Sequence, residues 1–363
     1  MKKKLMALFL TTVLAVGMIA CGGSAASSTA EKEEAPKEEA SQEEAPKEEA
    51  PKEEAPAEEA SQEEAPTEEQ KAYKIAYFVK DGSMPFWRYV IIGAQGEAEK
   101  QGCTVTEFAP DAITNAAMQI NQIEDAINSG FDALCVIAID GEAALPALQK
   151  AHDAGIPVVL ANGRIDAFED QVAFVGVDNI EASRIVTTAL YEELQKQDKH
   201  NVVAITNPPA AWVTSQRIQP VQDLAEEYGI NLVTIQSGEG SRETAMSVME
   251  NLLESGEEID AVWCMNDAMA MGVYQAILNA GKEDEIMISG FDGTPEGILA
   301  VDEGKIFVTI DQGPFDQGSK AVAAAIATLN GETVDKIIPT GGTLITKDNA
   351  RAFYDEYYAD LVG

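Results

Sequence analysis

Asn266 and Asp292 each follow closely on an apolar run that has the character of a buried strand. The two runs are residues 261–265 and residues 286–290. A carboxylate accepts hydrogen bonds from two hydroxyls, whereas an amide both donates and accepts them. Together the two side chains suit a guest that is rich in hydroxyl groups. The alternative is a structural role, since Asn and Asp also cap helices and fill turns before glycine.

The segment between the two runs has the spacing of a helix. Met269, Val273 and Ile277 recur at intervals of four residues, and Gly281 follows where this helix should end. A strand, a helix and a strand in this order predict two parallel neighbours that are joined by a right-handed crossover. Both polar residues then lie at the carboxyl ends of strands, which is the edge where open α/β sheets bind their ligands.

The same stretch resembles a known family of proteins. Residues 266–272 read NDAMAMG and residues 290–295 read GFDGTP. Both phrases are similar to segments of the sugar-binding periplasmic proteins of type I fold, the ribose- and galactose-binding kind that serve ABC transporters. The similarity extends from about Tyr73 to near the C-terminus. It implies an α/β fold of two doubly wound parallel-sheet lobes, joined by a hinge of three crossings, and a monosaccharide bound between the lobes.

The alternation of strand and helix continues along the chain and sets the expected lobe boundaries. Strands are expected at residues 74–79, 104–108, 133–137, 157–160, 174–177, 201–205, 231–235 and 305–310, and helices at 114–129, 142–154, 180–195, 215–228, 242–253, 295–302 and 314–329. A last helix, capped by Asp348 and Asn349, should end near Leu361. By the resemblance, residues 72–177 with 313–339 form the N-terminal lobe, and residues 178–312 with 340–363 form the C-terminal lobe.

Two aromatic residues lie beside the end of the first expected strand. Pro85 favours a helix start, which places Phe86 and Trp87 in the first helical turn. Aromatic faces stack on sugar rings, and the family uses the residue that matches Phe86 in this way. The alternative is that one of the two aromatic residues belongs to the core.

The residue before this proline departs from the family pattern. Ribose- and galactose-type relatives have a polar Asn or Asp here that contacts the sugar, whereas this chain has Met84. Lys80 and Ser83 are the candidates to supply the lost hydrogen bond. Lys80 also gives the chain a slight resemblance to receptors for autoinducer-2. The identity of the sugar therefore does not carry over from the family.

Four further residues align with the site of the family or lie beside it. Asn162 matches an Asn of the galactose-type proteins, although Asn-Gly is also a strong turn motif. Arg217 aligns with an arginine that binds sugar hydroxyls, the alternative being a structural role at a helix start. Gln312 matches an amide that contacts the sugar, and Trp212 either stacks on the sugar or covers the hinge. The predicted ligand-binding set is Lys80, Phe86, Trp87, Asn162, Trp212, Arg217, Asn266, Asp292 and Gln312.

The N-terminus has the layout of a lipoprotein signal. Three lysines precede an apolar run that ends at Ala20, and residues 17–22 resemble a bacterial lipobox in which Cys21 is the lipidated residue. Met18 stands where Leu is usual, and the alternative is ordinary secretion after cleavage. Residues 1–20 are predicted to be the signal peptide. Residues 21–71, rich in Glu and Pro, are predicted to be a disordered tether.

Composition and motifs narrow the class of function. The formal net charge of −37 makes nucleic acid an improbable partner, because a strongly acidic surface repels phosphates. Four cysteines without metal-site spacing predict neither a disulfide framework nor a metal site, and no acidic calcium loop is present. His152 and His200 have no catalytic partner pattern, and no hydrolase or nucleotide-binding motif occurs. We expect no catalysis, although two carboxylates at glycosidase spacing are invisible to sequence. No cofactor is expected.

Three hypotheses for function follow. The first is a membrane-tethered, monomeric transport receptor that delivers a monosaccharide to an ABC transporter permease. The second is a sensor of a small furanose-like signal or a nucleoside receptor with the same fold. The third, a repressor of related fold, requires an N-terminal helix-turn-helix, where this chain has a lipoprotein signal. The amide and carboxylate pair of Asn266 and Asp292 favours the first hypothesis.

Overall fold

The computed structural model describes residues 71–209 and 212–359. The predicted signal peptide, Cys21 and the predicted tether up to residue 70 lie outside the described residues. Among the described residues, no helix has the length and apolar character that a membrane span requires.

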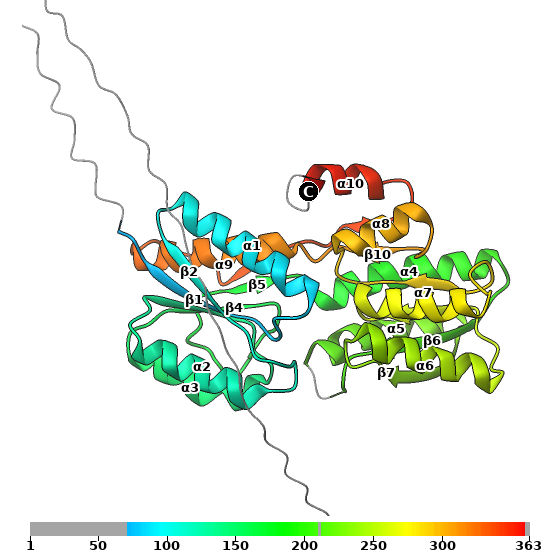
Figure 1. Ribbon diagram of the computed structural model, residues 1–363, viewed down its shortest axis with the longest axis horizontal. Helices are drawn as coiled ribbons and strands as arrows, with labels where there is room; N and C mark the ends of the chain where they lie inside the picture. Colours follow the sequence, from blue (N-terminus) through cyan, green and yellow to red (C-terminus); the bar gives the residue numbers. More distant parts are fainter. Residues whose placement is uncertain (1–70, 210–211, 360–363) are drawn as a thin grey trace, which may run out of the picture. The chain divides into compact units, whose positions relative to one another are not determined.

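The first sheet has six parallel strands in the order β11-β5-β4-β3-β1-β2. The side chains of strand β1 alternate between the two faces of the sheet. Ile75 and Tyr77 belong to one hydrophobic cluster, and Ala76 and Phe78 belong to a second cluster on the opposite face, so both faces of the sheet are covered. Helices α1 and α9 cover one face, and α2 and α3 cover the other (Figure 1). The elements are β1 (Lys74–Phe78), α1 (Pro85–Lys100), β2 (Thr104–Phe108), α2 (Ala116–Asn128), β3 (Ala133–Val136), α3 (Gly141–Asp153), β4 (Val158–Ala161), β5 (Phe174–Gly176), α9 (Pro314–Leu329) and β11 (Ile337–Pro339).

The second sheet has four parallel strands in the order β7-β6-β8-β9. Helix α4 packs against α5, and α6 packs against α7. The elements are α4 (Asn179–Lys196), β6 (Asn201–Thr206), α5 (Trp212–Tyr228), β7 (Asn231–Ser237), α6 (Arg242–Ser255), β8 (Ala261–Cys264), α7 (Asp267–Asn279), β9 (Met287–Ser289) and α8 (Pro295–Glu303). Cys135 in β3 and Cys264 in β8 are buried and unpaired, as expected for small apolar side chains within strands.

The chain passes between the two sheets three times, after β5, after β10 (Thr309–Ile310) and after β11. Strand β10 pairs antiparallel with β12 (Leu344–Ile345) beside the second sheet. This arrangement gives two doubly wound α/β lobes with a three-crossing hinge, as predicted. Gly313 starts α9 with a φ of 62°, and a Cβ there would press on the backbone of Gly341 in the third crossing.

Two local predictions were wrong. The strand expected at residues 305–310 is reduced to Thr309–Ile310, because the N–H groups of Lys305 and Ile306 bond back to Ala300 at the end of α8. Asn349 precedes α10 (Ala350–Tyr357) without capping it. Its side-chain oxygen instead accepts from the Thr346 N–H at 2.8 Å, and its amide donates to the Leu344 carbonyl at 2.9 Å, which closes the preceding turn.

Candidate ligand-binding site

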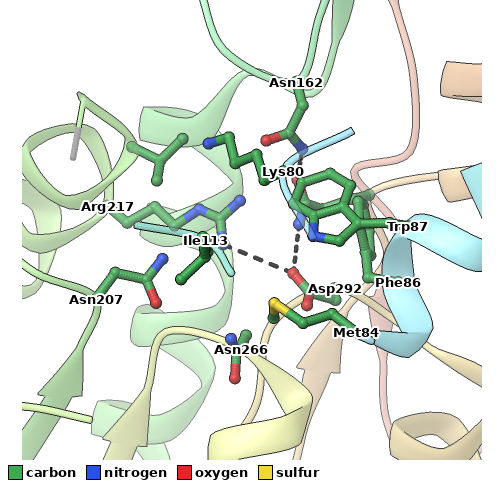
Figure 2. A pocket seen from close by; sticks show the side chains of 12 residues that line it. Lys80, Met84, Phe86, Trp87, Ile113, Asn162, Asn207, Arg217, Asn266 and Asp292 are labelled. Atoms are coloured by element: carbon green, nitrogen blue, oxygen red, sulfur yellow. Dashed lines mark hydrogen bonds and ion pairs between the residues drawn. The ribbon is translucent and has the colours of Figure 1, made fainter. Parts of the chain in front are cut away.

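Side chains from both lobes line one pocket at the carboxyl edges of the two sheets (Figure 2). The lining residues are Lys80, Met84, Phe86, Trp87, Ile113, Asn162, Asn207, Val213, Arg217, Asn266, Asp292 and Gln312. All of the predicted site residues except Trp212 are among them. Trp212 is half-buried at the start of α5, and the next residue, Val213, faces the pocket in its place. The role of each residue in ligand binding stays a prediction.

Arg217 and Asp292 form the charged centre of the pocket. The Arg217 Nη1 lies 3.7 Å from the Asp292 Oδ1, an ion pair that is longer than a hydrogen bond. The guanidinium also donates to the Asn179 Oδ1 at 2.8 Å and to the Met265 carbonyl at 2.9 Å. It lies 3.8 Å from the centre of the Phe291 ring. Arg217 is therefore fixed by several elements, which supports the structural interpretation of this residue alongside its place in the pocket.

Burial shifts the ionisation of these groups. Desolvation raises the pKa of Asp292, and the neighbouring Arg217 lowers it, with burial the larger effect. Burial lowers the pKa of Arg217 to about 10, opposed by the charge of Asp292. Burial also lowers the pKa of Lys80 to about 8, assisted by repulsion from Arg217. The charged groups of the pocket are therefore the Arg217–Asp292 ion pair and the Lys80 amine.

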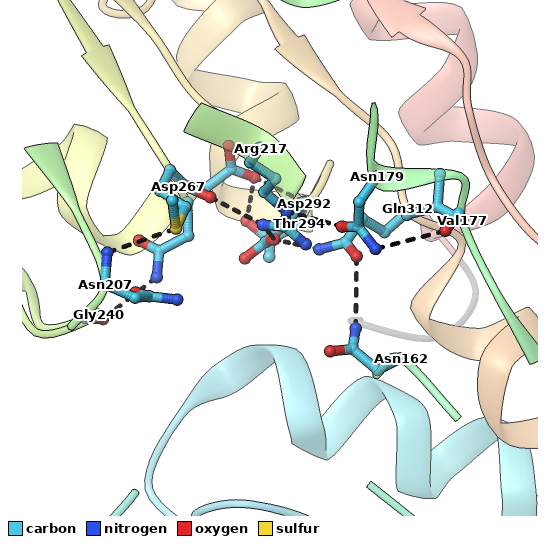
Figure 3. A network of polar contacts seen from close by, with 12 residues as sticks. Asn162, Val177, Asn179, Asn207, Arg217, Gly240, Asp267, Asp292, Thr294 and Gln312 are labelled. Carbon is cyan, nitrogen blue, oxygen red and sulfur yellow. Dashed lines mark hydrogen bonds and ion pairs between the residues drawn. The ribbon is translucent and has the colours of Figure 1, made fainter. Parts of the chain in front are cut away.

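A chain of amides connects the two lobes (Figure 3). The Asn162 amide donates to the Gln312 Oε1 at 3.4 Å and to the Gln317 Oε1 at 3.2 Å. The Gln312 amide in turn donates to the Asp292 carboxylate. The amide chain joins three of the polar lining residues, and Asn266 lines the same pocket, as the strand-end argument requires.

Asn266 caps a helix, which is the structural alternative that the sequence left open, while its role in ligand binding stays a prediction. Its Oδ1 accepts from the Met269 N–H at 2.7 Å, which makes it the N-cap of α7, and its amide donates to the Gly240 carbonyl at 3.3 Å. The residue also lines the pocket. Its neighbour Asp267 is structural: the carboxylate accepts three hydrogen bonds, from the N–H and hydroxyl of Thr294 and from the Thr309 hydroxyl.

Residues 75–333 match the family model described as periplasmic binding protein domain. The chain belongs to the periplasmic binding protein family. The ribose import binding protein of Bacillus subtilis is 30% identical over 269 residues, which span 74% of this chain and 86% of that protein. A Bacillus halodurans ABC transporter solute binding protein with bound myo-inositol has a TM-score of 0.73 and 28% identity, covering 80% of this chain and all of that one. A solute binding protein of Actinobacillus succinogenes with bound D-allose has a TM-score of 0.73 and 28% identity, covering 77% of this chain and 99% of that one.

In this periplasmic binding protein, both predicted aromatic residues serve the core and the pocket. Phe86 and Trp87 are 4% and 6% exposed, and their rings meet edge to face at 4.9 Å. Both also belong to the hydrophobic cluster under α1. Both residues therefore belong to the core and also line the pocket, while stacking on a sugar ring stays a prediction.

Four residues that line the pocket of the binding protein were missing from the predicted set: Met84, Ile113, Asn207 and Val213. Asn207 had a usable signal, because it follows directly on β6 (Asn201–Thr206) at the same sheet edge as Asn266. Ile113 lies in the loop between β2 and α2, where no periodicity indicates which side chain turns inward. Ser83 lies outside the pocket lining, and its N–H bonds to the Asp81 carboxylate at 2.6 Å.

Proposed function

We propose that this binding protein is the solute receptor of an ABC import system, which takes up a monosaccharide or a similar polyhydroxylated ring between its lobes and delivers it to a permease. The observation that carries the proposal is the convergence of Asn162, Gln312, Asn266 and Asp292 on one cavity between the two sheets. Amides and an acid in this arrangement replace water around several hydroxyls at once. The named ligands of relatives, ribose, myo-inositol and D-allose, support this class of guest.

The pocket chemistry favours binding over catalysis. Glycoside hydrolysis uses two carboxyl groups that flank the bond to be broken. Among the described lining residues, Asp292 is the single carboxylate, and Arg217 and Gln312 already engage it. Members of the family are binding proteins. We therefore assign Asp292 to ligand recognition, in a protein that releases its guest unchanged.

We further propose that the protein acts outside the cell membrane as a monomer, held there by a lipid on Cys21. The acidic, proline-rich residues 21–71 would act as an extended tether between the lipid and the lobes. In this arrangement the lobes stay near a membrane permease while they sample the surrounding solution.

A thermal-shift screen of the full chain against pentoses, hexoses, inositols and nucleosides tests the proposed ligand class. A guest that binds the folded state raises the melting temperature by mass action, so a sugar or inositol should produce the shift.

A variant of Asp292 then tests the role of this residue. Asp292→Asn should weaken the binding of that guest by about 10- to 100-fold in a calorimetric titration, because one charged acceptor is lost. The exposed Asp284→Ala is the matched control and should bind as the native protein does. A shift by nucleosides alone would exclude the carbohydrate class, and unchanged affinity of Asp292→Asn would remove Asp292 from the site.

A further inference from the structure

Lys80 is a buried cation that no described residue neutralises. It follows β1 by two residues and is 9% exposed. Figure 2 shows its side chain reaching into the pocket above Arg217. Among residues 71–209 and 212–359, no carboxylate forms an ion pair with Lys80, and its ammonium donates no hydrogen bond. Its one recorded partner is the Trp87 ring, whose centre lies 5.9 Å from the Nζ. The Lys80 Nζ is not among the fully buried polar atoms that lack a partner, so it faces the pocket as a cation that is free to pair with a negatively charged guest.

Lys80 gives the pocket lining an excess of positive charge. Lys80 and Arg217 are positive and Asp292 is negative, and Asp292 is engaged by Arg217. Three other buried acids, Asp81, Asp267 and Asp311, lie outside the pocket lining. Asp267 accepts hydrogen bonds from the hydroxyls of Thr294 and Thr309, Asp311 from the Gly313 N–H at 2.9 Å, and Asp81 from the Ser83 N–H. The lining therefore carries one net positive charge, in a chain whose formal net charge is −37. The composition of the chain alone would predict a negatively charged pocket.

A second donor on the same wall is also unused. The Trp87 indole N–H is buried and has no hydrogen-bond acceptor among the described residues. Trp87 lines the pocket beside Lys80, and Figure 2 draws its ring nitrogen toward the middle of the cavity. An ammonium and an N–H on one wall match the two oxygen atoms of a carboxylate, which accepts both.

We propose that the guest is a monosaccharide that carries one carboxylate, an aldonate or a uronate, and that Lys80 selects it by pairing with this group while Trp87 donates the second hydrogen bond. The inference rests on the proposed function and names the subclass of sugar. One excess positive charge balances one carboxylate. A phosphate monoester carries about −1.5 to −2 at neutral pH and would set uncompensated charge against Asp292. Lys80 stays largely protonated at pH 7, since its pKa is lowered only to about 8.

Titration calorimetry of the full chain at pH 7 with matched sugars tests the proposal. The pairs are D-glucose and D-glucuronate, D-galactose and D-galacturonate, and D-ribose and D-ribonate, with D-glucose 6-phosphate as a doubly charged comparison. At least one acid should bind about tenfold or more tightly than its neutral parent, and more tightly than the phosphate. Lys80→Met should weaken that acid by about 30-fold or more, and by a larger factor than it weakens the neutral parent, whereas Lys80→Arg should retain most of the preference. Lys74→Met, an exposed lysine of β1, is the matched control.

The outcomes separate this inference from the proposed function. If neutral parents bind more tightly than their acids, or if Lys80→Met leaves the preference for the acid intact, the carboxylate assignment is wrong while the sugar receptor stands. Tighter binding of the phosphate overturns the assignment in the same way. If no sugar of either class binds, the proposed function fails, and the inference fails with it. The comparison of acid with parent uses the native chain, so it decides the question even if a variant does not fold.

Discussion

Asn162 and Asp292 hold backbone conformations that side chains rarely adopt. Asn162 has a φ of 61°, and Asp292 has a φ of 120°, well outside the left-handed helical region that Asn and Asp tolerate. Such strain persists where the surroundings impose it, and here the Asp292 N–H bonds to Ile310 and its carbonyl accepts from the Gln312 N–H, both at 3.0 Å. The backbone of the second crossing thereby fixes the direction of the Asp292 carboxylate toward Arg217.

The pH dependence of binding follows from Lys80. Its pKa in the free protein is lowered to about 8, and a bound carboxylate would raise it again. Binding of an acid then takes up a proton above pH 8, so the affinity should fall by up to about tenfold per pH unit from pH 8 to pH 9.5. Calorimetric titration of the preferred acid across this range measures the slope. The neutral parent should show a flat profile.

One variant, Lys80→Arg, tests whether that slope belongs to Lys80. Lys80→Arg stays protonated, so the profile for the acid should become flat above pH 8. Arg217 and Asp292 are the other charged groups that face Lys80 in the pocket. An equal slope in the native protein and in Lys80→Arg would contradict the role of Lys80.

Sequence located the site residues more reliably than it located their side-chain partners. Position after a buried strand placed Asn162 at the carboxyl edge of the first sheet and Asn266 and Asp292 at that of the second, because parallel strands of one sheet all end at the same edge. It could not show that the Asn266 oxygen is occupied by the Met269 N–H, or that Trp212 lies outside the lining while Val213 lies within it. Those outcomes depend on side-chain rotamers and on neighbours that are distant in sequence.

At the scale of elements, helices α1 and α9 approach so closely that backbone meets backbone. A Cβ at Gly93 would collide with the Phe315 carbonyl, and a Cβ at Gly318 would collide with the Val90 carbonyl. This contact anchors α9, which follows the second crossing, onto the first lobe. The hinge therefore joins two firmly packed bodies, and motion on binding is directed into the crossings.

The glycine contact predicts opposite effects for two alanine substitutions in one helix. Gly93→Ala should lower the free energy of unfolding by roughly 1–3 kcal/mol, because α9 must move away. Gly96→Ala, three residues along in α1, meets open space and should raise it by roughly 0.5–1 kcal/mol through helix propensity. Urea denaturation of both variants gives the two values. Equal effects of the two substitutions would contradict close packing of α1 on α9.

Most elements were predictable because buried parallel strands are short apolar runs, and the helices between them keep a regular spacing. The failures occurred where tertiary contacts set the boundary. Helix α5 begins at Trp212, three residues before the predicted start, and the strand predicted from Lys305 loses its first residues to the end of α8. The close approach of α1 and α9 was also invisible, since Gly93 and Gly318 are far apart in sequence.

At the scale of the whole molecule, the polar chain from Asn162 through Gln312 to Asp292 spans the hinge and joins the two sheets. A guest that replaces these contacts would bind both lobes at once, so its binding energy would favour the closed arrangement over an open one. The lipid anchor that we propose acts at the other end of the chain. Binding and anchoring should therefore be separable, because Cys21 lies far in sequence from the residues that line the pocket.

That separation gives the prediction for Cys21. When the full chain is produced in a bacterial host that processes lipoproteins, it should incorporate a radiolabelled fatty acid and partition into the detergent phase, since two acyl chains anchor a protein stably. Cys21→Ala should lose the label while its sugar affinity stays within about twofold of the native protein. Cys103→Ala is the matched control, because Cys103 is a buried, unpaired cysteine of the first lobe and should leave the label in place. Label retained by Cys21→Ala would place the lipid on another residue, and an unlabelled native chain would mean that the tether ends in solution.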